Sequence, residues 1–134
     1  MADYILTIVE QVGLMLAELA RLKSGEKPAG ISVLCLRETG LPLAVVKHSS
    51  PETILQLLKT GGGTQYARAV LLAELLIQDA DISDAAGKKR EAIISRAQAA
   101  ALLEHSIDQL SPEEQAIYRP KLDALTSGLK RISR

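Results

Sequence analysis

A chain of 134 residues that is 47% hydrophobic and 24% charged matches the size and composition of one globular domain, so we expect a single domain over residues 1–134. Its formal net charge is zero and it has no Phe, no Trp and three Tyr, which argues against nucleic-acid binding by charge or by base stacking. The single cysteine excludes an internal disulfide. No apolar run approaches the roughly 20 residues of a membrane span, and the N-terminus lacks the basic region of a signal peptide. We therefore expect a cytoplasmic protein without a membrane partner.

Apolar residues at steps of three and four predict a first helix from Asp3 to about Ser24, with Gly25 in the left-handed position that ends it. The apolar stripe of this helix contains Ile5, Ile8, Val12, Met15, Leu19 and Leu22. Its width leaves two alternatives open: the stripe packs in the core, or it forms an interface.

Pro28 suits the first turn of a second helix, over residues 28–39. Backbone N–H groups in the first turn have no acceptor within the helix, so the N–H that proline lacks is not needed there. Val33, Leu34 and Leu36 would form its buried side. Residues 31–36 also alternate in the manner of a strand, but a helix is favoured. We expect a loop over residues 40–50.

Ser50, Pro51 and Glu52 form a helix start, with a hydroxyl cap, a first-turn proline and an acid at the positive end of the dipole. This short helix, over residues 51–60, should end at the glycine run of residues 61–63. Thr64 would cap the helix that follows.

Residues 64–107 predict two antiparallel helices joined by a tight turn at residues 86–88. Ala80 precedes the turn and Ala92 and Ala99 follow it, and such small side chains permit close approach of two helices. Residues 69–77 are apolar nearly all round, which indicates the buried centre of the fold.

Residues 111–114 form a capping box that opens a last helix, in which Pro120 should cause a kink or a restart near Arg119. The predicted fold is all-α, with about six helices in antiparallel hairpins and no sheet.

The hairpin resembles that of the tetratricopeptide-repeat (TPR) family. Gly87, Ala92 and Ala99 match the small positions of the family's second helix, and Ala80 matches the small position of its first helix. The family's large or aromatic positions are not kept, and the earlier pair of helices, near residues 14–34, is more degenerate. These departures are Leu76, Ser83 and Arg96 in the hairpin, and Glu18 and Gly30 at the small positions of the earlier pair.

The layout is also similar to that of a short, uncharacterised bacterial family with a TPR-like fold. The shared features are a Leu-Lys-x-Gly turn at residues 22–25, a Gly-Leu loop at residues 40–41 and a short helix before the long hairpin. This resemblance implies no activity.

These features predict a non-enzymatic protein-interaction or self-assembly module that binds a helical or extended partner segment in a groove. The partner is another protein or a second copy, as a homodimer, and no cofactor or metal is expected. In TPR-like hairpins the first helix lines the groove, so the predicted partner-binding residues are Met15, Leu19, Leu22, Glu74, Ile77, Asp81 and Asp84.

Two alternatives belong to other functional classes. A small-molecule or anion sensor would use the glycine run of residues 61–63, together with the basic turn of residues 88–90. An all-α metal-dependent hydrolase would use Asp79, Asp81, Asp84 and His105, although the chain has no calcium-loop order and no Glu-x-x-Glu or His-Asp motif.

A single thiol and two histidines offer little further chemistry. Cys35 lies between two leucines and is predicted to be a small buried hydrophobe rather than a nucleophile. His105 and Asp108 have the spacing of two metal ligands on a helix, but His48 is the only other histidine.

Overall fold

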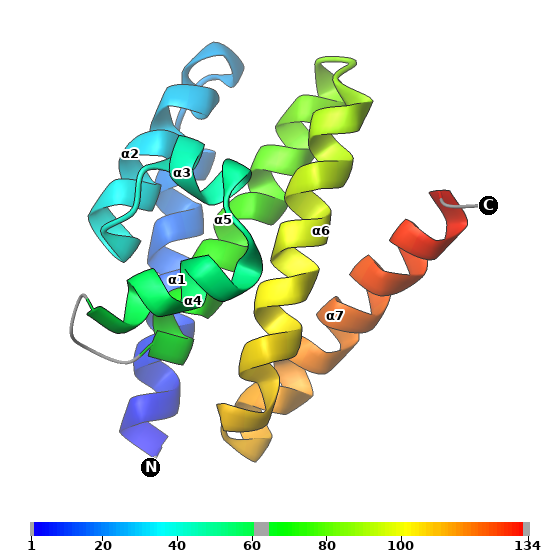
Figure 1. Cartoon of the computed structure of the whole chain (residues 1–134). Coiled ribbons are helices and arrows are strands. Elements are labelled where there is room, and N and C mark those ends of the chain that lie inside the picture. The colour runs from blue at the N-terminus through cyan, green and yellow to red at the C-terminus, as the bar shows by residue number, and fades with distance from the viewer. Residues whose placement is uncertain (1, 61–64, 133–134) are drawn as a thin grey trace.

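The computed structural model describes the backbone of residues 2–60 and 65–132, and the side chains of residues 8–59 and 66–131. Within these ranges the chain forms seven α-helices and two short 3-10 helices, with no strand (Figure 1). The fold is therefore all-α, as predicted. The elements are α1 (Ala2–Ala20), η1 (Ser24–Glu26), α2 (Lys27–Thr39), α3 (Leu43–His48), α4 (Pro51–Thr60), α5 (Gln65–Ala85), α6 (Lys89–Ser106), η2 (Ile107–Gln109) and α7 (Pro112–Ile132).

The antiparallel pair of α5 and α6 forms the centre of the molecule, and its turn is the predicted one. Gly87 has a φ of 80°, a left-handed conformation that favours glycine, and Lys88 N–H donates to the Ser83 carbonyl at 2.8 Å. Ala80, Ala92 and Ala99 are completely buried. Small side chains at the contact between the two helices allow this close packing.

Other helices cover α5 on several sides, which explains why its first half is apolar all round. It contacts α1, α2, α4 and α6, and every residue from 69 to 76 is buried. Ile77, the last residue of the predicted central stretch, is half-buried. The core therefore surrounds the first half of α5 and leaves part of its second half open.

The first two helices differ in detail from the prediction. Helix α1 ends at Ala20 rather than near Ser24, and Gly25 lies in η1 rather than in a left-handed cap. The left-handed glycine of this region is instead Gly40, with a φ of 79°, directly after α2. Glu26 accepts a hydrogen bond from the Lys23 N–H at 2.9 Å and so stabilises the 3-10 turn that replaces the end of the predicted helix.

Helix α2 confirms the helical reading of residues 28–39 and excludes the strand. Its buried side consists of Ile31, Leu34, Cys35 and Thr39, which share one face at helical spacing. Val33 and Leu36 were predicted to be buried, but they are 63% and 54% exposed. The prediction failed because these two residues lie on the face opposite Ile31 and Cys35.

The predicted loop over residues 40–50 contains a helix, α3. Gln98 of α6 donates from Nε2 to the Val46 and Ser49 carbonyls, at 2.9 and 2.6 Å, which satisfies backbone acceptors at the end of this short helix. Lys47 also pairs with Asp79 of α5 at 3.0 Å. Contacts with the hairpin therefore stabilise α3. Local sequence preferences did not predict this helix.

The remaining caps follow the prediction where the structure describes them. The Thr53 N–H donates to Ser50 Oγ at 3.2 Å, and Ser111 and Glu114 form the reciprocal capping box at 3.2 and 2.8 Å. Helix α7 continues through Pro120 without the predicted restart. The glycine run and Thr64 lie outside the described residues.

Candidate functional site

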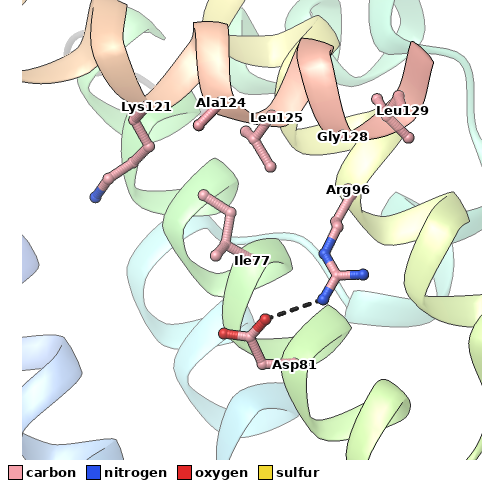
Figure 2. A pocket seen from close by; sticks show the side chains of 8 residues that line it. All are labelled: Ile77, Asp81, Arg96, Lys121, Ala124, Leu125, Gly128 and Leu129. Carbon is pink, nitrogen blue, oxygen red and sulfur yellow. Dashed lines mark hydrogen bonds and ion pairs between the residues drawn. The ribbon is translucent and has the colours of Figure 1, made fainter. Parts of the chain in front are cut away.

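Helix α7 begins beside the end of α6 and then diverges from it, as Figure 1 shows, which leaves a hollow between its second half and the central hairpin. We call this cavity the α7 hollow; it has a volume of about 380 Å³. Figure 2 shows Leu125 pointing from α7 toward Ile77 of α5, with Asp81 and Arg96 beside them. The lining residues are Ile77, Asp81, Arg96, Lys121, Ala124, Leu125, Gly128 and Leu129.

A second hollow also borders α5 and lies between this helix and the beginning of α2. We call it the α2 hollow; it has a volume of about 460 Å³. It is lined by Ser24, Lys27, Pro28, Gln78, Asp81, Ile82, Ala85 and Ala86. Because Asp81 lines both hollows, the two are adjacent, and the open face of α5 forms their common floor. We call the two hollows together the α5 groove.

Charged residues at the centre of the groove form one ion-pair cluster. Arg96 of α6 donates to Asp81 Oδ1 at 3.1 Å, and it approaches Asp84 Oδ2 at 2.6 Å. The side chains of Asp81 and Asp84 remain 61% and 41% exposed. Two carboxylates share one guanidinium, so this cluster carries a net charge of −1.

A more buried ion pair closes one end of the groove. Lys121 of α7 donates to both carboxylate oxygens of Glu74, at 2.9 and 2.8 Å, and Glu74 is 4% exposed. The Lys121 ammonium also lies 5.6 Å from the centre of the Tyr118 ring. Burial, followed by the negative charges of Glu74 and Glu114, raises the pKa of the Tyr118 hydroxyl well above its usual range. Tyr118 therefore stays neutral at physiological pH.

The structure places the predicted partner-binding residues in three environments. Met15 and Leu19 are buried in the core, so the stripe of α1 packs against the chain itself in this region rather than forming a surface. Leu22 is partly buried and its side chain packs against Gly30. A side chain at position 30 would collide with Leu22. The pairing of α1 with α2 and α5 explains this burial.

Of the four predicted residues of α5, three lie on its open second half, and Glu74 lies in the buried first half. Ile77 and Asp81 line the α7 hollow, Asp84 joins the cluster through Arg96, and Glu74 is covered by Lys121. Arg96 was predicted only as a departure from the TPR pattern, and four groove residues of α7 were not predicted: Ala124, Leu125, Gly128 and Leu129. The apolar spacing within residues 122–129 was the available signal, but nothing in it indicated the helix it would face.

The acidic residues proposed for a metal site are not gathered together. Asp79 points to the other side of α5, where it accepts a hydrogen bond from Ser95 Oγ at 2.7 Å and pairs with Lys47. His105 lies near Glu52, at 3.8 Å, and Asp108 pairs with Arg119 at 3.5 Å. Among the described residues, no group of three or more His, Cys, Asp or Glu side chains has an arrangement that could hold a metal ion.

The thiol of Cys35 is completely buried, as predicted, and its Sγ contacts the Leu41 carbonyl at 3.2 Å. Burial raises the pKa of this thiol, so the reactive thiolate is disfavoured at neutral pH. Cys35 therefore acts as part of the core.

The two segments proposed for an anion sensor adjoin opposite ends of α5. Gln65 is the first described residue after the glycine run, and Ala85 ends the helix just before the basic turn. Twenty residues of α-helix separate these ends by about 30 Å. The basic residues of the turn, Lys88, Lys89 and Arg90, are exposed.

No protein-family model, curated protein or solved structure matches this chain. No helix in the described part of the chain is long and apolar enough to cross a membrane.

Proposed function

We propose that this protein is a non-enzymatic interaction module that binds a helical or extended segment of a partner protein in the α5 groove. The observation that carries the proposal is the pair of hollows on the two sides of Asp81, each lined by apolar residues together with polar or charged ones and open to solvent. Concave sites of this kind, with a few placed polar groups, are where proteins bind ligands.

The resemblance to TPR hairpins supports the same proposal. In that family the first helix of a hairpin lines the binding groove, and here α5 is the first helix of the central hairpin and forms the groove floor. A partner helix laid into an apolar groove would use its own apolar face as the anchor.

Site-specific photocrosslinking in the cells that make this protein tests the proposal. A photoreactive amino acid at Gln78 or Ala124 would face the groove, and the same group at the exposed Ala97 of α6 is the matched control. We expect crosslinks to one protein from both groove positions and not from the control. A crosslink between two copies would identify self-assembly, and crosslinks no different from those of Ala97 would contradict the proposal.

A further inference from the structure

We infer that the segment bound in the α5 groove is an amphipathic helix with two apolar anchors seven residues apart and a basic residue between them. The anchors would fill the two hollows, and the basic residue would pair with Asp81. This inference rests on the proposed function and specifies the partner's chemistry.

The linings of the two hollows determine the kind of anchor. In the α7 hollow, Ile77, Leu125 and Leu129 supply apolar surface, while Ala124 and Gly128 leave room for an inserted side chain. In the α2 hollow the apolar lining comes from Pro28, Ile82, Ala85 and Ala86. Cavities of this volume accept an aliphatic side chain such as Leu, and removing that side chain from water makes the free energy of binding more favourable.

The spacing of the anchors follows from the geometry of α5. Ile77 and Ile82 are five residues apart and so lie about 140° apart around the helix, on its two flanks. An α-helix with its side chains is about 10–12 Å across, so a bound segment must span roughly that distance between hollows. Residues i and i+7 of a helix are about 10.5 Å apart and on the same face, which matches this span.

The charge at the centre of the groove selects a basic residue. Asp81 lies between the hollows with most of its carboxylate exposed, and Arg96 must serve Asp84 as well. Position i+3 or i+4 of the bound helix would face this carboxylate. Lys121 is already paired with Glu74. Lys27 lines the α2 hollow together with Asp81, but within the described part of the chain the ion pair of Asp81 is the one with Arg96.

Three synthetic helical peptides on an Ala/Gln background test the inference by fluorescence anisotropy. The first has Leu at i and i+7 with Arg at i+4, the second has Glu at i+4, and the third has Ala at both anchor positions. We expect the first to bind and to shift the backbone amide signals of Ile77, Asp81 and Ile82 in NMR spectra. Replacing Arg by Glu should weaken binding several-fold, and replacing both Leu by Ala should weaken it by about tenfold or more.

Variants of the protein identify the groups responsible. Asp81→Asn should remove most of the preference for Arg over Glu, whereas Asp123→Asn, a matched change at an exposed α7 position outside the groove, should leave it unchanged. Gly128→Leu should fill the α7 hollow and weaken the first peptide.

Equal binding of the Arg and Glu peptides, or no binding of the first peptide, would overturn the inference. The photocrosslinking experiment separates this result from failure of the proposed function. Groove-specific crosslinks together with a failed peptide test would mean that a partner binds by another chemistry.

Discussion

Lys121 of α7 donates to both carboxylate oxygens of Glu74 of α5, and the two residues are 47 positions apart in the chain. The carboxylate is buried whereas the ammonium is partly exposed, so the lysine compensates for the loss of water around Glu74. This pair connects α7 directly to the groove floor and so helps to define the angle at which the α7 hollow opens.

Replacing Lys121 by Met should therefore lower the free energy of unfolding by about 2 kcal/mol, because Glu74 would be left buried without its charged partner. Urea denaturation measures the change, and Lys130→Met, at an exposed position of the same helix, should have almost no effect. The double variant with Glu74→Leu should lose less than the sum of the two single variants. Strict additivity would show that the pair is not energetically coupled.

The Ala contacts of the central hairpin give a second prediction. Ala99 is completely buried against α5, so Ala99→Leu should force the helices apart and cost about 1–3 kcal/mol in the free energy of unfolding. Ala97→Leu lies two residues earlier on the exposed side of the same helix and is the control, with an expected effect near zero. Equal stability of the two variants would mean that small size at Ala99 is not required.

The cap of α7 gives a third prediction. Ser111 Oγ accepts a hydrogen bond from the Glu114 N–H, so Ser111→Ala should destabilise the protein by about 1 kcal/mol. Ser127→Ala, at an exposed position within α7, should change the stability by a few tenths of a kcal/mol at most. Thermal unfolding followed by circular dichroism compares the two variants. A larger loss at Ser127 would contradict the assigned cap.

The elements that sequence predicted well are those determined by local chemistry. Ser50 and Ser111 cap helices because their hydroxyls reach nearby N–H groups, and Gly87 supplies the left-handed turn of the hairpin. Helix α3 was missed because it is short and depends on Gln98, about 50 residues away in the chain. Long-range contacts of this kind leave no periodic signal in the segment that they stabilise.

The same distinction applies to the candidate site. Ile77 and Asp81 were predictable because they share a face of α5 at a spacing of four residues. The partners supplied by α6 and α7, Arg96 and Leu125, depend on how the helices cross, which the sequence of one helix does not specify. Burial of Met15 likewise depends on α2 and α5 covering α1.

The hydroxyl of Tyr118 gives the last prediction, which concerns alkaline pH. Its pKa is raised in the folded protein, first by burial and then by Glu74 and Glu114, whereas an unfolded tyrosine ionises near pH 10. Raising the pH through about 10 deprotonates Tyr118 in the unfolded chain, while the folded chain keeps the proton. The contribution of Tyr118 protonation to the free energy of unfolding is therefore complete below that pH and is lost above it.

Tyr118→Phe removes the titrating group with little change in shape. Urea denaturation at about pH 8 and pH 11 should therefore show a smaller loss of stability for the variant than for the wild type. Tyr66→Phe, at a half-buried tyrosine of α5, keeps the Tyr118 hydroxyl and is the matched control for the loss of a tyrosine hydroxyl. If Tyr118→Phe loses as much stability as the wild type over this range, the ionisation of Tyr118 is not coupled to folding.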